Sequence, residues 1–497
     1  MKREKIENAL NEISDSFIRE AAGAKTKPRL APWFGVVAAV LAAALIAGAL
    51  WQPGSALPKS TQHPSPTLTG TPTEGRNSTI HQAFYLSAPV YPDLCGYPLE
   101  FDSGTYAQWL ADQEALHDQP EGYADNLHGC FSKMVPLLLA GNGGDNAVCS
   151  PLNIYMALAM LAESTDGASR EQILQLLDAD SLEALRRQAG QVWKANYNDD
   201  GLTTSVLASS LWLDSECTVN RQTADLLAEH YFASVFSGDL GSAEMNEALR
   251  SWLSEQTGGL LDGFIEDVKM DPRTVLALAT TVFFQTQWCD PFQARNNTTD
   301  TFHGTAGDTT ETFMNQTLSY GPYYWSEHFG AVQLELEGGC NMWLFLPDEG
   351  TSPEQLVQSG ELFQFLQAKP NIRASEFGNK KHLIVNLSMP KFDIGTRQDL
   401  SDALKALGVT DIFDSEKADF TPILPEKDGG YVDQAEHAAR VAVDEEGVTA
   451  AAFTLIQRYG AGMPPEEEMD FVLDRPFAFV IESQDGLPLF AGIVNQP

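Results

Sequence analysis

The feature that most constrains this chain is residues 439–465, which have the pattern of a loop and also of a buried strand. The stretch begins as a strand, because Val441 and Val443 alternate with polar neighbours, and it ends at Pro464-Pro465. Between these ends lies Gly447, followed by five residues with little bulk. If they formed a strand, one small to apolar face would carry Val448, Ala450, Ala452, Thr454 and Ile456. The pattern therefore predicts an element with two structural states.

The residues after this stretch read as strand, turn and strand, over 470–483 and 487–494. Without further information, 439–465 is a long exposed loop between two strands, with a glycine hinge and a proline stop. An ordinary Ala-rich hairpin loop is the alternative.

The hinge sequence resembles that of the serpins, the serine protease inhibitors. Its matching residues are Asp444, Glu445, Glu446, Gly447, Val448, Thr449, Ala450, Ala451 and Ala452. Further blocks resemble the family in the same order along the chain: 146–162, 276–292, 342–347, 387–392, 399–413 and 474–479. The resemblance covers roughly 126–497. It implies an α+β serpin fold with three β-sheets, eight or nine helices and an exposed reactive-centre loop.

The resemblance also locates the bond that a protease would attack. Counting seventeen residues from Glu445 leads to Ala461, and counting back from Pro464-Pro465 leads to the same bond, Ala461–Gly462. Alanine before the cut suits a serine protease with a small, shallow pocket, of the elastase or subtilisin type. We expect cleavage at Arg458 or Tyr459 to inactivate the inhibitor instead, because the inserting strand would be too short.

A buried polar cluster that controls sheet opening is also implied by the resemblance. His437 and Ser150 match it, and Trp288 matches the tryptophan at the top of the insertion site. Asn153 stands where serine is usual and Thr280 where asparagine is usual, an exchange that could keep the same hydrogen bonds. Polar core residues satisfied locally are the alternative interpretation.

The resemblance implies inhibition by suicide-substrate trapping, in which the protease supplies the catalysis and a covalent complex results. Val448 stands where the family usually has a small polar residue, and Phe453 stands where it commonly has alanine. Neither residue carries a charge, so insertion should survive. A non-inhibitory serpin-fold binding protein is the alternative. A hydrolase is disfavoured, because no G-x-S-x-G, H-E-x-x-H or Walker motif occurs.

Composition excludes some partners. The 497 residues carry a formal net charge of −37, which argues against binding to nucleic acid. The six cysteines have no C-x-x-C spacing, so we expect no metal site and at most one disulfide; no cofactor signature is found. A monomer is expected.

The N-terminal region predicts a membrane anchor. Residues 1–31 form a cytoplasmic segment with seven basic and five acidic residues, and 32–51 are long and apolar enough to span a bilayer. Residues 52–80 are a Pro/Ser/Thr-rich linker, 81–125 a lead-in of unknown role, and 126–497 the serpin domain outside the cell. Secretion after signal cleavage is the alternative. The anchor and linker style predicts a bacterial source.

Overall fold

The structure is a computed structural model that describes residues 84–98, 103–139, 143–368, 379–426, 430–448, 465 and 467–497. All the described residues belong to one compact unit, 69–497. Within the described ranges, no helix is long and apolar enough to cross a membrane. The predicted cytoplasmic segment at 1–31, the anchor at 32–51 and the whole linker at 52–80 lie outside those ranges.

Eleven α-helices occur in the described residues, where the resemblance implied eight or nine. They are α5 Ser103–His117, α6 Leu127–Leu139, α7 Pro151–Ser164, α8 Gly167–Leu176, α9 Leu182–Asn196, α10 Arg221–His230, α11 Ala243–Gln256, α12 Asp262–Ile265, α13 Pro353–Ser359, α14 Glu361–Ala368 and α15 Ser401–Ala406. The excess comes from short helices such as α12 and from α5, which belongs to the lead-in.

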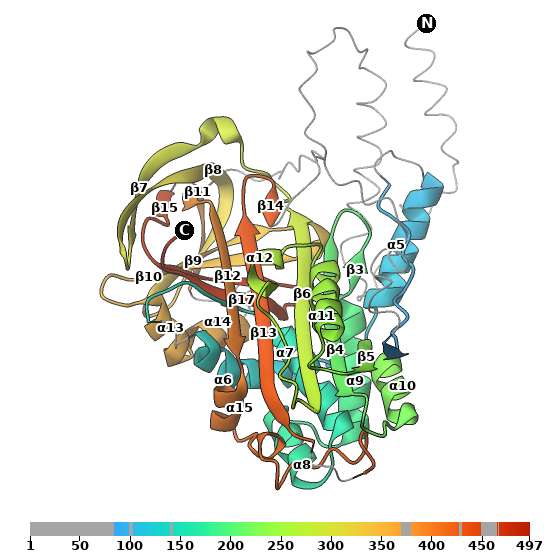
Figure 1. The fold of residues 1–497 in the computed structure, drawn as a ribbon. Coiled ribbons are helices and arrows are strands. Elements are labelled where there is room, and N and C mark those ends of the chain that lie inside the picture. The colour runs from blue at the N-terminus through green and yellow to red at the C-terminus, as the bar shows by residue number, and fades with distance from the viewer. Residues whose placement is uncertain are drawn as a thin grey trace, which may run out of the picture. The chain divides into compact units, whose positions relative to one another are not determined.

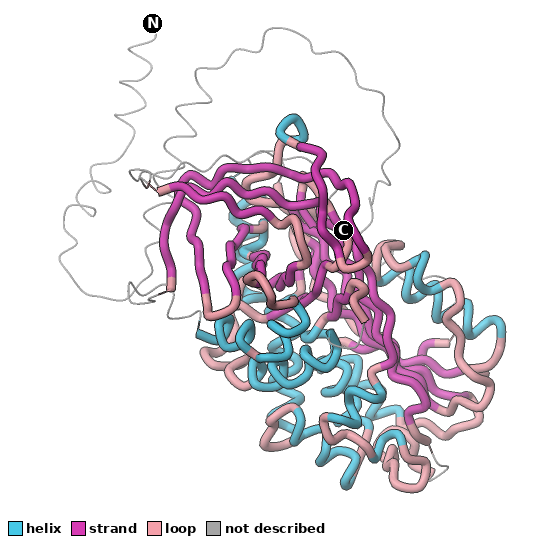
Figure 2. The backbone as a smooth tube through the Cα atoms, turned by 90° about the vertical axis from the view of Figure 1, so that its left-hand side faces the viewer, coloured by secondary structure: helices cyan, strands magenta, loops and turns pink. Residues whose placement is uncertain are grey.

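The first sheet has eight strands in the order β1-β5-β4-β6-β14-β13-β12, with β3 paired to β4 (Figure 1). Their bounds are β1 Tyr85–Ser87, β3 Asn198–Asp199, β4 Thr204–Asp214, β5 Ala233–Gly238, β6 Leu276–Gln287, β12 Phe392–Asp399, β13 Val432–Val443 and β14 Gly447–Val448. Helices lie on both sides of the strands (Figure 2).

The second sheet has nine strands in the order β15-β11-β8-β9-β10-β16-β17-β2, with β7 paired to β8. Their bounds are β2 Ala147–Cys149, β7 Thr298–Gly304, β8 Gly307–Trp325, β9 Phe329–Glu335, β10 Asn341–Pro347, β11 Lys380–Pro390, β15 Glu468–Val472, β16 Phe477–Glu482 and β17 Pro488–Val494. The expectation of three sheets was wrong for the described residues. The 19-residue strand β8 pairs with β7, β11 and β9, so it joins what would be two sheets into one.

The two faces of the first sheet pack against different layers. Alternate residues of β6, such as Leu278 and Val282, belong to the main core that also contains most of α7. The intervening residues, such as Ala279, pack against α11 and α12 in a second, smaller core. We call these the inner and outer faces of the sheet.

The lead-in segment is more ordered than its sequence indicated. β1 pairs antiparallel with β5 and so extends the edge of the first sheet. Tyr91 packs on Trp193 of α9, with ring centroids 5.1 Å apart, and Trp109 of α5 donates a 2.8 Å hydrogen bond to Asp200. Residues 84–98 and α5 therefore pack as part of the same body as the serpin domain.

Apolar periodicity in the sequence predicts helices at 127–139, 168–178, 181–195 and 221–232 and a strand at 276–288. The structure confirms them as α6, α8, α9, α10 and β6. The strand predicted over 470–483 is instead two strands, β15 and β16. Pro476, which lacks a backbone N–H, lies in the break between them.

Candidate functional site

The first sheet contains a gap between β6 and β13. At its lower end the two strands pair in parallel, with His437 opposite Thr280. At its upper end β14 lies between them, with Val448 opposite Val443 on one side and Thr286 on the other (Figure 1). Among the described residues, no pairing joins 281–285 of β6 to 438–442 of β13. Over these six residues, or about 20 Å, β6 and β13 change from directly paired neighbours to strands with one further strand between them.

The two sides of this gap keep the same relative register along its length. At the lower end, His437 and Thr280 differ by 157 in number, and across β14 Val443 and Thr286 also differ by 157. A strand that continued from Val448 would therefore find both neighbours already in register. Val448 is buried in the main core, so it presents its side chain to the inner face.

A tight turn carries the chain from β13 into β14. The Asp444 carboxylate accepts hydrogen bonds from the backbone N–H groups of Glu446 (2.9 Å) and Gly447 (3.2 Å). The Trp288 indole donates to the Asp444 carbonyl at 2.9 Å, and the Trp288 N–H donates to the Glu446 carbonyl at 3.0 Å. A Cβ at Gly447 would overlap the Thr286 carbonyl, so glycine is required by the close approach to β6.

Glu445 fastens the turn to two connecting segments, one between β11 and β12 and one just before β7. Its carboxylate pairs with Lys391 at 2.5 Å and accepts a 2.6 Å hydrogen bond from Asn297. Burial opposes ionisation, but the bonds from Lys391 and Asn297 outweigh it and hold the pKa of Glu445 below its usual range. Sequence reasoning missed Lys391 and Asn297. Lys391 lies within the block 387–392 that resembles the family, but nothing local pairs it with Glu445.

His437 and Ser150 meet directly at the lower end of the gap. The Ser150 N–H donates to His437 Nε2 at 3.0 Å, while the Ser150 hydroxyl caps α7 by accepting from the Asn153 N–H at 3.4 Å. Because Nε2 accepts, the neutral ring carries its proton on Nδ1. Burial lowers the pKa of His437 to about 4, so the ring is neutral near pH 7.

Three side chains at this point carry buried polar atoms without hydrogen-bond partners among the described residues. They are both amide atoms of Asn153, the Thr280 hydroxyl and His437 Nδ1. All three residues are at most 3% exposed. The bond that an exchange of amide and hydroxyl would allow between Asn153 and Thr280 is therefore not made. A buried polar group that stays without any partner costs about 1–3 kcal/mol.

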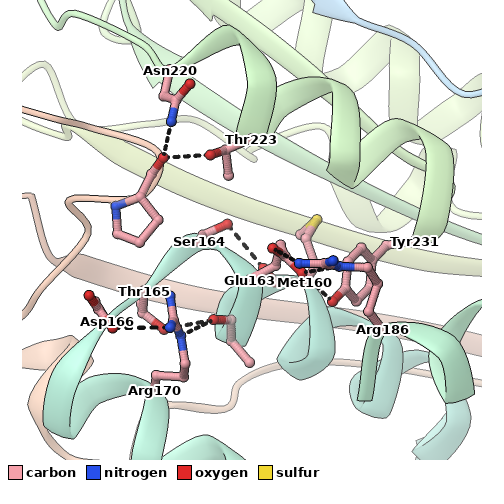
Figure 3. A network of polar contacts seen from close by, with 12 residues as sticks. Met160, Glu163, Ser164, Thr165, Asp166, Arg170, Arg186, Asn220, Thr223 and Tyr231 are labelled. Carbon is pink, nitrogen blue, oxygen red and sulfur yellow. Dashed lines mark hydrogen bonds and ion pairs between the residues drawn. The ribbon is translucent and has the colours of Figure 1, made fainter. Parts of the chain in front are cut away.

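The far end of α7, which carries Ser150 and Asn153 at its start, is held by a polar network (Figure 3). Glu163 forms a two-pronged ion pair with Arg186 of α9 at 2.7 and 2.8 Å and accepts a 2.8 Å bond from Tyr231. This network ties α7 to α9 through Arg186 and to the end of α10 through Tyr231. It thereby fixes the helix that positions the polar cluster.

The described residues thus bring together Ser150, Asn153, Thr280 and His437 at the lower end of the gap, and Trp288, Glu445, Glu446, Gly447 and Val448 at its upper end. Thr449, Ala450, Ala451, Ala452 and the bond Ala461–Gly462 lie outside them. Within the described part of the chain, all six cysteines are free thiols and no cluster of three or more His, Cys, Asp or Glu could hold a metal.

This fold and site define a class of protein in which two strands of the central sheet separate at one end and the short strand β14 enters between them. Comparison with known proteins identifies the class. The family model described as Serpin (serine protease inhibitor) matches residues 132–497, and the chain belongs to the serpin family. Members are in general protease inhibitors rather than enzymes.

Similar proteins include serpin-Z1C of Triticum aestivum, 29% identical over 372 residues, which cover 72% of this chain and 91% of the relative. Serpin-ZXA of Oryza sativa subsp. japonica is 28% identical over 380 residues, covering 72% and 92%. Among solved structures, the thermophilic serpin tengpin in the native state matches with a TM-score of 0.67 and 24% identity, covering 76% of this chain and 95% of that one. This last likeness shows the fold alone.

Proposed function

We propose that this chain inhibits serine proteases by suicide-substrate trapping. The protease attacks the carbonyl of Ala461 and forms an acyl-enzyme, and the bond to Gly462 breaks. Residues 447–461 then insert between β6 and β13 before the ester is hydrolysed, and the protease is carried with them. The gap in the first sheet, with matching register on its two sides, is the observation that supports this proposal most strongly.

The register at Val448 gives each inserted residue its neighbours. Because the inserted strand runs antiparallel to both neighbours, a residue n positions after Val448 would lie between the residue n positions before Val443 in β13 and the residue n positions before Thr286 in β6. Ala450, Ala452, Thr454 and Ile456 would then face the main core, as Val448 does. Thr454 would lie between His437 and Thr280, where polar atoms lack partners. Hydrogen bonds from the Thr454 hydroxyl to these polar atoms would favour insertion.

The target follows from the residue before the cut. Alanine at 461 suits an elastase- or subtilisin-like protease with a shallow pocket. The nearest basic residue, Arg458, lies three residues earlier. Cleavage by a trypsin-like enzyme at Arg458 should therefore release the protease intact.

The direct test is to mix residues 80–497 with an elastase-like protease and analyse the products on a denaturing gel. The proposal predicts an SDS-stable band at the summed mass and a C-terminal peptide that starts at Gly462. Complete cleavage with an active protease would indicate a non-inhibitory serpin instead.

A matched pair of loop variants sharpens this test. Ala450→Glu would place a charge on the inner face, in the core, whereas Ala451→Glu would place it on the outer face at the level of Arg440. Burying an unpaired charge costs several kcal/mol, so the first variant should be cleaved as a substrate and the second should still form the complex. Equal behaviour would contradict the register.

The N-terminal region completes the proposal. Residues 32–51 would anchor the chain as a single membrane-spanning helix, after a cytoplasmic segment at 1–31. The linker at 52–80 would hold a monomeric inhibitor on the outside of a bacterial cell. Fractionation of cells that express the full chain tests this: the protein should remain with membranes after a high-salt wash, whereas release into the medium would support signal cleavage.

A further inference from the structure

A small cavity lies on the outer face of the first sheet, directly in front of the lower end of the gap. It is walled by Leu249 and Leu253 of α11 and Ile265 of α12, and floored by Ala277 and Ala279 of β6 and Ala438 of β13. We call this the sub-helix pocket. Its volume is about 70 Å³, well below the roughly 300–1,000 Å³ of sites that take small-molecule ligands. Its size and lining therefore suit one apolar side chain.

Ion pairs lie at the rim of the sub-helix pocket. Arg397 of β12 contacts Glu436 of β13 at 3.0 Å and Asp267, just after α12, at 2.9 Å. This charged rim encloses an apolar interior, an arrangement that disfavours a polar or charged occupant.

The register at Val448 indicates which residues would reach this pocket. Residue 455 lies seven positions after Val448, so it would pair with Glu436 in β13 and with Ala279 in β6. Both of these residues line the pocket. Residue 453 would pair with Ala438, at the upper end. Both residues are an odd number of positions from Val448, so their side chains would lie on the outer face, opposite to that of Val448.

The occupants that the sequence supplies at these positions are Leu455 and Phe453. On one side of each, the flanking sheet residue would be an alanine: Ala279 beside Leu455 and Ala438 beside Phe453. Large side chains on the incoming strand thus match small ones on the receiving strands, which avoids overpacking beneath α11.

We propose that the sub-helix pocket receives this chain's own loop once β6 and β13 have separated beneath it, and that it takes Leu455, with Phe453 beside Ala438 at its upper end. The inference rests on the proposed function, because it requires the loop to insert. It explains how the bulky Phe453 is accommodated on the outer face. It also makes the pocket a checkpoint late in insertion, since Leu455 arrives only after the strand has passed His437 and Thr280.

The test fills the pocket from its floor. In Ala279→Leu the added carbons occupy the space that Leu455 needs, so we expect insertion after loop cleavage to slow about tenfold, equivalent to about 1.4 kcal/mol in the barrier. The readout is the rise in thermal midpoint after limited proteolysis in the loop, followed over time; it requires no trapped protease. Adding Leu455→Ala to Ala279→Leu should restore the wild-type rate.

Two loop variants keep the test decisive if Ala279→Leu folds poorly. Leu455→Asp should abolish most of the rise in thermal midpoint, whereas the volume-conserving Leu455→Met should retain it. A wild-type rise that persists unchanged in Ala279→Leu and in Leu455→Asp would overturn the pocket assignment alone. No rise in the wild-type protein would instead refute loop insertion, and both proposals with it.

Discussion

Protonation of His437 should destabilise the native sheet below neutral pH. The ring is buried, and its Nε2 accepts the Ser150 N–H, a bond that the protonated ring cannot make. Its pKa is about 4 in the folded protein against about 6.5 unfolded, so the unfolded chain binds the proton more readily. The stabilisation is therefore complete above pH 6.5 and is lost as the pH falls from 6.5 towards 4.

The size of this effect follows from the two pKa values. At pH 5 the loss in free energy of unfolding is about 2 kcal/mol, and at pH 4 about 3 kcal/mol. The assay is the urea midpoint from tryptophan fluorescence, measured after a fixed incubation at pH 7.5, 6, 5 and 4. His437→Gln keeps an acceptor but does not titrate, so its stability should fall less over the same range.

The difference between wild type and His437→Gln cancels the contributions that other titrating groups make to the pH dependence of stability. His117 is one of them, since burial also lowers its pKa. If wild type and His437→Gln lose stability in parallel from pH 7.5 to 4, His437 does not control the lower end of the gap. The reasoning from burial and from the Ser150 bond would then be refuted.

Three further predictions concern single substitutions. Gly447→Ala should destabilise the intact protein by about 1–3 kcal/mol and so lower its thermal midpoint, because the added Cβ meets the Thr286 carbonyl. An unchanged midpoint would contradict the close approach. Thr454→Val should destabilise the loop-cleaved form by about 1 kcal/mol while sparing the intact form, as separate thermal scans can establish. Arg186→Ala should cost about 3 kcal/mol in chemical denaturation, because it leaves the buried Glu163 without its cation; a loss below about 1 kcal/mol would indicate that Tyr231 suffices.

Local pattern was sufficient to predict the elements with strong periodicity. The apolar run at 276–288 became β6, and the helix at 127–139 formed although Pro136 lies within it. The break between β15 and β16 was missed although Asp474, Arg475 and Pro476 interrupt the apolar pattern there, because the apolar residues on its two sides read as one strand. The merging of two expected sheets depends on the length and pairing of β8, which no local signal fixes.

For the site, resemblance identified the residues but not their contacts. The parallel register that sets His437 beside Thr280 joins strands more than 150 residues apart and is not visible in sequence. The same holds for the pairing of Glu445 with Lys391 and for the absence of a bond between Asn153 and Thr280. Packing and register decide these features, and both are properties of the whole fold.

The central claim is that the loop fills the gap between β6 and β13. Amide hydrogen exchange tests it most directly when intact protein is compared with protein cleaved between Ala461 and Gly462. The account predicts that residues 281–285 and 438–442 become strongly protected after cleavage, because both edges gain a hydrogen-bonded neighbour. If these two segments exchange equally fast before and after cleavage, the loop does not enter the sheet and the account is wrong.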